Sequence, residues 1–364
     1  MKHEFKFVLL AIFVFFTILS SQIYSQENEK KSVIIEKLKK DNENLGHRLD
    51  VIQKKVDDII WHQRVGEVAF IDKVYLAGPP RWKIKDTTAQ GAKNPLKFWS
   101  YVFIPKGIDF NKEYPLIVFP HGGVHSNFTT YYTHIIKELI AQQYIVVAAE
   151  YRGSTGYGKT IYERIDYGGL EYEDVNVSRQ YMIDNYSFVD EDRVGIIGWS
   201  HGGLITLMNI FEHSENYKVA FAGVPVSDLI ARMGYQTQGY RDLYSADYHI
   251  GQTAYENVEE YRRRSPAWQT HKFKNTPLLI HTNTNDDDVN VLEVEHLIKS
   301  LKADGKKFEY KIFKDIPGGH SFDRIDRKQA KEIRLKIYQH LAKELNPPKQ
   351  LKTLEDITKA AYLK

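Results

Sequence analysis

The stretch from Arg193 to Leu204, RVGIIGWSHGGL, limits the folds open to this chain more than any other segment. Its β-branched run VGII contains no proline and predicts a buried strand. The pentapeptide Gly198–Gly202 follows with the pattern G-x-S-x-G, and apolar residues then recur at helical spacing. A strand, a tight turn and a helix in this order can hold Ser200 as an exposed nucleophile on a strained turn.

The two glycines of the pentapeptide have a steric reason in this interpretation. Residues two before and two after such a serine approach the neighbouring backbone too closely to carry a Cβ atom. The backbone N–H of His201 would then point at an oxyanion that develops beside Ser200. The alternative is an ordinary glycine-rich loop between a strand and a helix, and the flanking pattern favours the catalytic interpretation.

Composition narrows the possible functions. The chain has 364 residues, of which 42% are hydrophobic, so it can bury one sizeable α/β core with some additional structure. It contains no cysteine, which excludes disulfides, thiolate metal sites and cysteine catalysis. The net charge is +3 and no basic stripe alternates with aromatic residues, so we expect no nucleic-acid partner. We also expect no cofactor.

Residues 1–25 have the composition of a secretory signal. Lys2 and Lys6 precede an apolar run of about 13 residues, which is short for a membrane span of about 20, and small residues follow. We therefore expect an exported protein, periplasmic or secreted, without a stable membrane span after cleavage. An uncleaved N-terminal anchor is the alternative.

Residues 26–80 are predicted to form a helical N-terminal extension. Apolar residues recur there at intervals of three and four, and a break is expected near Gly46. The segment packs either on its own domain, which is the simpler interpretation, or on a partner. The sequence is compatible with an oligomer but does not specify one.

Residues 81–346 are predicted to form the catalytic domain, followed by a C-terminal tail over 347–364. Strands and helices alternate from about residue 96 onward, which predicts a mostly parallel, doubly wound sheet covered by helices on both faces. Residues 227–270 interrupt this alternation as a longer insertion rich in tyrosine and arginine, suited to a lid or a pocket wall. In such sheets, functional side chains gather on the loops at the carboxyl ends of strands.

A serine nucleophile needs a base, and the base needs an orienting acid, in the chain order serine, acid, histidine. The loop after the predicted strand at 277–282 offers three aspartates, Asp286, Asp287 and Asp288. At least one of them is expected to cap the following helix instead. The base is expected to be His320, which follows two glycines in a loop after another strand.

The oxyanion hole needs a second N–H donor besides that of His201. Gly122 and Gly123, in the loop that follows an earlier strand, allow their backbone N–H groups to face a substrate carbonyl. His121 and His125 stand four apart in the same loop, but no acidic ligand accompanies them, so we predict no metal site.

Together these segments resemble the prolyl oligopeptidase family of serine hydrolases, in its acylaminoacyl-peptidase and dipeptidyl-peptidase-like branch. The resemblance covers roughly residues 95–345. The matching stretches are HGGVHS at 121–126, EYRGSTGYGK at 150–159, DRVGIIGWSHGG at 192–203, PVSDL at 225–229, PLLIHTNTNDDDV at 277–289 and PGGHSF at 317–322.

The resemblance implies an α/β-hydrolase fold and a triad of Ser200, Asp286 and His320. Asp286 stands three residues before Val289, as is usual in this superfamily, and Asp287 is the alternative because the loop has one extra residue. The resemblance also implies substrate-binding roles in or near the pocket for the four residues His121, Tyr151, Val226 and Val289.

Two departures from the family pattern bear on specificity. His121 stands where the oligopeptidases place a tyrosine that donates to the oxyanion. Only residues 26–95 lie between the predicted signal and the hydrolase region, so we expect no β-propeller to restrict substrates. The sequence thus predicts a secreted serine peptidase that cleaves peptide or acyl-amino bonds through an acyl-enzyme. The alternatives are a carboxylesterase for small or carbohydrate-linked esters, and a non-catalytic binding protein on a hydrolase scaffold.

Overall fold

A single eight-stranded sheet organises the part of the chain that the structure describes, residues 2–84 and 86–362 of a computed structural model. Its strand order is β1-β2-β4-β3-β5-β6-β7-β8, and β3 to β8 run parallel while β1 and β2 pair antiparallel. The strands are β1 Ala69–Gly78, β2 Leu96–Pro105, β3 Tyr114–Val118, β4 Ile145–Glu150, β5 Val189–Trp199, β6 Val219–Gly223, β7 Leu278–Asn283 and β8 Glu309–Phe313.

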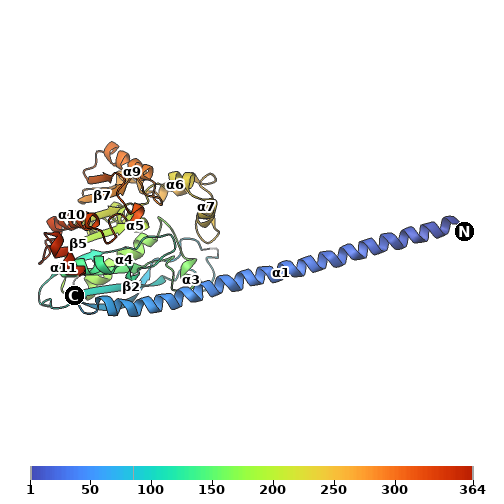
Figure 1. Ribbon diagram of the computed structural model, residues 1–364, viewed down its shortest axis with the longest axis horizontal. Coiled ribbons are helices and arrows are strands. Elements are labelled where there is room, and N and C mark those ends of the chain that lie inside the picture. The colour runs from blue at the N-terminus through green and yellow to red at the C-terminus, as the bar shows by residue number, and fades with distance from the viewer. Residues whose placement is uncertain (1, 85, 363–364) are drawn as a thin grey trace.

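Helices cover both faces of this sheet (Figure 1). One face carries α4, α5 and α9, and the other carries α2, α10, α11 and the end of α1. The central strands β3, β4, β6 and β7 are buried along their whole length, as expected for a parallel sheet covered on both sides. The predicted doubly wound, mostly parallel sheet is therefore confirmed. The helices are α1 Lys2–Val65, α2 Thr133–Ala141, α3 Lys159–Tyr162, α4 Glu171–Asn185, α5 His201–Glu212, α6 Leu229–Tyr235, α7 Gln238–Ser245, α8 Val258–Arg263, α9 Val291–Ala303, α10 Lys328–Leu345 and α11 Leu354–Ala361.

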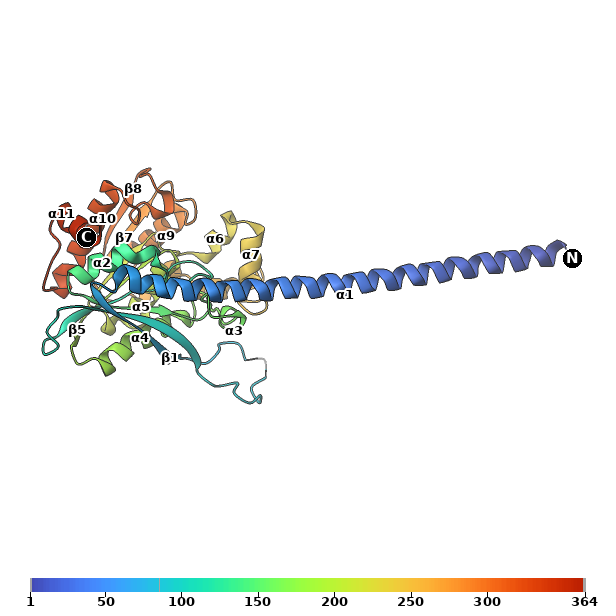
Figure 2. The same ribbon diagram turned by 60° about the horizontal axis from the view of Figure 1, so that its bottom comes forward.

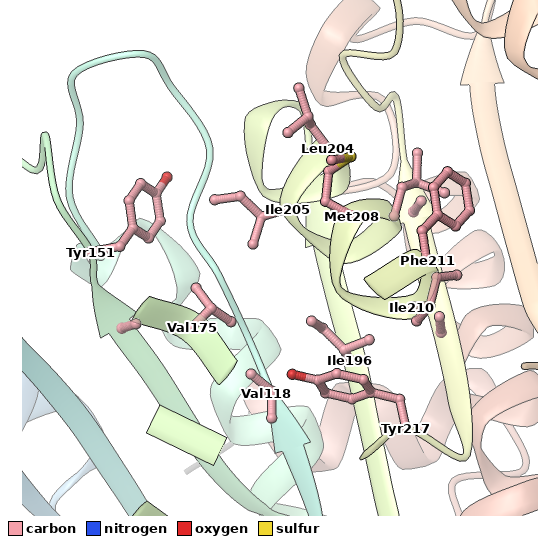
Figure 3. Packing of buried hydrophobic residues seen from close by; sticks show 14 of the residues in the cluster. Val118, Tyr151, Val175, Ile196, Leu204, Ile205, Met208, Ile210, Phe211 and Tyr217 are labelled. Atoms are coloured by element: carbon pink, nitrogen blue, oxygen red, sulfur yellow. The ribbon is translucent and has the colours of Figure 1, made fainter. Parts of the chain in front are cut away.

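The core beside the predicted nucleophile is built by α5 against β5 and its neighbours (Figure 3). Ile205 of α5 points toward the side where Val175 of α4 lies, and Leu204 and Met208 of α5 belong to the same buried cluster. Ile196 of β5 belongs to the same buried cluster. Both the strand before Ser200 and the helix after it are thus fixed by apolar contacts, so the turn between them has little freedom to move.

The N-terminal extension differs from the prediction in two respects. Helix α1 continues through Gly46 without a break, because one glycine costs a helix only about 1 kcal/mol. The last part of the predicted helical extension, Ala69–Gly78, is instead the edge strand β1, paired along its full length with β2. The sheet therefore begins at residue 69, before the predicted domain boundary at 81.

Both ends of the chain were predicted as separate segments. The signal prediction for residues 1–25 falls largely on side chains, and on Met1, that lie outside the described residues, so it stays a prediction. None of the helices within the described residues is long and apolar enough to span a membrane. In the predicted tail, Thr353 and Asp356 form a capping box for α11, and Ile357 is buried against the domain. Residues 363 and 364 lie outside the described part.

His281 of β7 makes the stability of the fold depend on pH. Its ring packs between Phe221 and Phe313 at centroid distances of 5.2 and 5.1 Å, and burial lowers its pKa to about 3. Between that value and the ordinary 6.5, the unfolded chain binds a proton that the folded chain does not. His281 therefore costs stability as the pH falls from 7 to 5.

We expect His281→Phe and His281→Leu to remove this cost, whatever their effect at neutral pH. The free energy of unfolding of wild type, relative to either variant, should drop by about 2 kcal/mol between pH 7 and pH 5. Urea unfolding at the two pH values measures this difference. A wild-type-to-variant difference that does not change with pH would contradict the neutral, buried state of His281.

Candidate active site

Ser200 lies on the strained turn that the sequence predicts. It connects β5 to α5 with a φ angle of 60°, a conformation that costs a non-glycine residue about 1–3 kcal/mol. The turn is held from both sides, because Ser200 N–H donates to the Gly223 carbonyl at 2.9 Å and Val226 N–H donates to the Ser200 carbonyl at 3.1 Å. The neighbouring strand end thus fixes the Ser200 backbone.

The two glycines flanking Ser200 stand where no Cβ atom fits. A Cβ on Gly198 would lie 2.1 Å from the carbonyl oxygen of Gly202, and one on Gly202 would lie 2.4 Å from that of Pro120. In both cases the obstacle is backbone, which cannot swing aside as a flexible side chain can. The close approach inferred from the sequence is present, and it joins the Ser200 turn to the loop after β3.

Gly202→Ala should therefore destabilise the fold by about 3 kcal/mol, because it forces the Ser200 turn and the Pro120 loop apart. Gly46→Ala in α1 is the matched control, since a Cβ there meets nothing within 4 Å. That control should gain about 1 kcal/mol from helix propensity. Urea unfolding of both variants tests the pair, and a Gly202→Ala variant as stable as wild type would contradict the geometry.

The loops after β7 and β8 bring the side chains of Asp286 and His320 into contact. The Nδ1 atom of His320 lies 2.9 and 2.8 Å from the two carboxylate oxygens of Asp286. The Asp286 side chain is fully buried and also accepts hydrogen bonds from the N–H groups of Asp288 and Val289. Among the three aspartates, the structure therefore pairs Asp286 with the ring, and no described hydrogen bond joins Asp287 to it.

The third aspartate occupies the other side of the imidazole. Asp288 Oδ2 lies 3.6 Å from His320 Nε2, and Asp288 Oδ1 lies 2.9 Å from Nη2 of the buried Arg232. Arg232 belongs to α6, so the insertion over 227–270 supports the loop that carries Asp286. This support was not predicted, because it depends on a contact between segments more than 50 residues apart.

The His320 loop is tied directly to the strand that carries Ser200. Trp199 Nε1 donates a 2.8 Å hydrogen bond to Asp323, and Arg324 donates to the backbone carbonyl of His320. Among the described residues, no hydrogen bond connects Ser200 Oγ with His320. Serine and imidazole therefore come from loops at the same sheet edge without being bonded in this conformation.

The loop after β3 brings Gly122 against Ser200. A Cβ on Gly122 would lie 3.3 Å from the Cβ of Ser200 and 3.0 Å from the carbonyl oxygen of Trp199. Gly123 has a φ angle of 87°, and its carbonyl lies 2.8 Å from Nδ1 of His201. The two predicted oxyanion glycines and the residue after Ser200 are thus in direct contact.

His201 also contacts a buried carboxylate. Its Nε2 lies 2.6 Å from Glu171 of α4, and its ring stacks on Tyr167 at 3.7 Å. Both ring nitrogens of His201 thus lie within hydrogen-bond distance of an oxygen, the Gly123 carbonyl on one side and the Glu171 carboxylate on the other. Burial raises the pKa of Glu171, and the contact with His201 lowers it. Glu171 was missed in the sequence, where it is one of several acidic residues at a helix start.

The four residues predicted near the substrate pocket, His121, Tyr151, Val226 and Val289, are all buried. The His121 ring stacks on Tyr151 at 4.2 Å, and Tyr151 donates to the His121 carbonyl at 2.8 Å. Burial lowers the pKa of His121 to about 3, so the ring is neutral. In this conformation these residues support the loops around Ser200 and expose almost no surface to a substrate.

Lys54 of α1 contacts the loop after β3, which carries His121 and Gly122. Lys54 Nζ lies 2.7 Å from the carboxylate of Glu150, at the end of β4, and donates to the Phe128 carbonyl at 2.6 Å. Both side chains are buried, and Glu150 also accepts the Phe128 N–H and approaches His121 Nε2 at 3.5 Å. Lys54 was not predicted as a functional residue, because one lysine among many on a charged helix has no distinguishing sequence pattern.

We expect Lys54→Met to destabilise the protein by about 3–5 kcal/mol, because Glu150 is then buried without its partner. Lys55→Met, on the exposed side of α1, is the matched control and should change stability by less than about 0.5 kcal/mol. Urea unfolding at neutral pH compares the two. Equal stability of the two variants would rule out an energetic role for the Lys54–Glu150 pair.

No group of three or more His, Cys, Asp and Glu side chains in the described part of the chain is arranged to hold a metal ion. The ring of His125 is engaged elsewhere, stacked on Tyr162 at 3.5 Å and with Nδ1 2.9 Å from the Gly153 carbonyl. His121 and His125, the two histidines four apart in this loop, thus each make their own hydrogen bonds and ring contacts.

The sequence of the chain is similar to those of known peptidases. The family model "Prolyl oligopeptidase family" matches residues 130–347, more than half of the chain. Human dipeptidyl peptidase 8 is 31% identical over 225 residues, covering 59% of this chain and 24% of that protein. The uncharacterized peptidase YuxL of Bacillus subtilis is 30% identical over 233 residues, covering 64% and 34%. The matches thus span about a quarter to a third of these relatives' length.

Solved structures show the same fold. Acylaminoacyl peptidase of Pyrococcus horikoshii superimposes with a TM-score of 0.62 at 20% identity, covering 82% of this chain and 45% of that one. Puromycin hydrolase superimposes with a TM-score of 0.61 at 20% identity, covering 76% and 40%. These similarities establish the fold of the catalytic region as that of the α/β-hydrolases.

Proposed function

The chain belongs to the prolyl oligopeptidase family of serine peptidases, and on that premise we propose that it hydrolyses peptide or acyl-amino bonds with Ser200, Asp286 and His320 as its catalytic triad. One observation carries the proposal. Among the residues that the structure describes, Ser200 is the only serine with a positive φ, and it stands at the sheet edge where a buried carboxylate holds an imidazole through Nδ1. A serine hydrolase requires this arrangement, in which a carboxylate orients an imidazole and the imidazole takes the proton of the serine.

In the proposed reaction, His320 Nε2 removes the proton of Ser200 Oγ while the oxygen attacks the substrate carbonyl carbon. The N–H groups of His201 and of Gly122 or Gly123 stabilise the oxyanion that forms. His320 then gives the proton to the leaving amine, and the C–N bond breaks to leave an acyl-enzyme on Ser200. Water, deprotonated by the same ring, releases the acid and regenerates the serine.

His320 Nε2 lies 3.6 Å from Asp288 in this conformation, so in the reaction it must exchange that neighbour for Ser200 Oγ. Catalytic hydrogen bonds are often long or absent before substrate binds, so the free geometry is compatible with the mechanism. The Asp286 contact fixes the tautomer in which Nδ1 carries the proton and Nε2 is free to accept one. Asp288 is the side chain that the ring leaves, and it is nearly half exposed.

We expect a fluorophosphonate probe to label the wild type and not Ser200→Ala. Asp286→Asn should lower kcat by about 10⁴-fold, because the ring then adopts the wrong tautomer. Asp287→Asn, its matched neighbour, should remain within a few-fold of wild type. Labelling kinetics and initial rates on a chromogenic substrate measure both effects.

Matched aminoacyl amides and esters then separate peptidase from esterase activity, because only the amide needs strong protonation of its leaving group. Turnover of amides supports the proposal. Ester turnover without amide turnover would favour the esterase alternative, and labelling that persists in Ser200→Ala would refute the assigned nucleophile.

A further inference from the structure

Helix α1 carries an exposed apolar stripe with a regular seven-residue repeat. Its positions alternate at spacings of three and four from residue 35 to residue 59, which is the a/d pattern of a coiled coil. Seven of the eight are apolar and at least half exposed. The a positions are Ile35, Asn42, Leu49 and Val56, and the d positions are Leu38, Leu45, Ile52 and Ile59; we call these eight residues the α1 stripe.

The α/β-hydrolase domain, which we call the body, cannot cover the α1 stripe, because the body packs on the opposite side of the helix. His47, Lys54 and Trp61 are also seven residues apart, and all three face the body. The ring of His47 contacts Tyr162 at 4.9 Å, Lys54 pairs with Glu150, and the fully buried Trp61 stacks on Phe128 at 5.6 Å. These three positions fix the rotation of α1, so the stripe points away from the sheet.

Toward the N-terminus the helix leaves the body altogether. Glu43 accepts a hydrogen bond from Lys159 at 2.9 Å, and beyond it α1 continues as a rod that projects away from the domain (Figures 1 and 2). A single helix without tertiary contacts gains little stability from propensity alone. Ile35 and Leu38 lie on this projecting part, where they expose 53% and 62% of their surface.

Because the α1 stripe is long, we expect a helix of equal length to cover it. The stripe runs along about 37 Å of helix and exposes on the order of several hundred Å² of apolar surface. Monomeric soluble proteins rarely leave a contiguous patch of this extent uncovered. An identical stripe on a second helix would interdigitate with it as knobs into holes over more than three heptads.

We propose that the α1 stripe forms a parallel two-stranded coiled coil with a second copy of this chain. Asn42 is the residue that favours a second copy of the same chain, in parallel orientation, as the partner. An asparagine at a single a position meets its own counterpart only in a parallel, in-register pair, where the two amides bond to each other. Ile35 at a with Leu38 at d favours two strands, whereas Leu49 at a with Ile52 at d favours more. Asn42, which the coil buries, therefore decides the number of strands in favour of two.

The body leaves room for this arrangement. Because each catalytic domain docks on the side of α1 opposite the stripe, the two domains lie on the outside of the coil at the same end. Facing g and e′ positions carry no like charges, since Arg48 meets Gln53, Asp41 meets Gly46 and Lys55 meets Ile60. The parallel register therefore has no electrostatic penalty within the stripe.

The mass of the full chain in solution tests the proposal, by light scattering and sedimentation equilibrium. We expect two chains for wild type and one for Leu45→Glu/Ile52→Glu, which places charges at two d positions. Lys37→Glu/Asn44→Glu, at exposed c positions seven residues apart, is the matched control and should stay dimeric. Near-ultraviolet circular dichroism shows whether each variant keeps its folded body. A monomeric or trimeric wild type, or a dimer that survives the Leu45/Ile52 change, would overturn the proposal.

Orientation is tested by introducing a cysteine into a chain that has none. Leu38→Cys places identical d positions opposite each other in a parallel coil, within disulfide distance, so mild oxidation should give a covalent dimer. Lys37→Cys, one residue away on the outer side of the helix, should give far less. A dimer whose Leu38→Cys variant crosslinks no faster than Lys37→Cys would refute the parallel register.

Discussion

The contact between backbones around Ser200 is the constraint on which the site depends. The carbonyls of Gly202 and Pro120 lie where Cβ atoms of Gly198 and Gly202 would be, so β5, α5 and the loop after β3 meet without side chains between them. This packing and the backbone hydrogen bonds to Gly223 and Val226 together maintain the positive φ of Ser200, which an isolated turn would relax. The position of Gly122 against Ser200 is then a consequence of the same contact.

Around this contact, buried ion pairs hold each loop. Arg152, after β4, pairs with Asp174 of α4 and donates to the Pro79 carbonyl; Lys54 pairs with Glu150, and His201 meets Glu171. Such pairs add little net stability compared with apolar packing, but removing one partner is costly. These pairs therefore favour one arrangement of the loops over others. An active site needs one arrangement when its residues come from the ends of separate strands.

The sequence predicted what local chemistry determines. The steric need for glycine around Ser200, the alternation of strands and helices, and the loops carrying Asp286 and His320 all follow from short patterns. The choice between Asp286 and Asp287 did not, because it depends on which carboxylate the loop turns inward. Lys54 and Glu171 were missed for the same reason, since their partners lie 96 and 30 residues away. Strand β1 was assigned to the helical extension because its pairing with β2, not its own pattern, defines it.

In the proposed dimer, helix α1 couples the association of two chains to the active site, because both depend on α1 being helical. The α1 stripe and Lys54 lie on opposite sides of the same turns, and Lys54 contacts the loop that carries Gly122 through Phe128 and Glu150. A partner that binds the stripe stabilises the helical state of α1, and by linkage it also stabilises every contact that requires α1 to be helical. The Lys54–Glu150 pair is such a contact. A coiled coil through the stripe would therefore order the base of the oxyanion loop without touching it, and loss of Lys54 would in turn weaken the association.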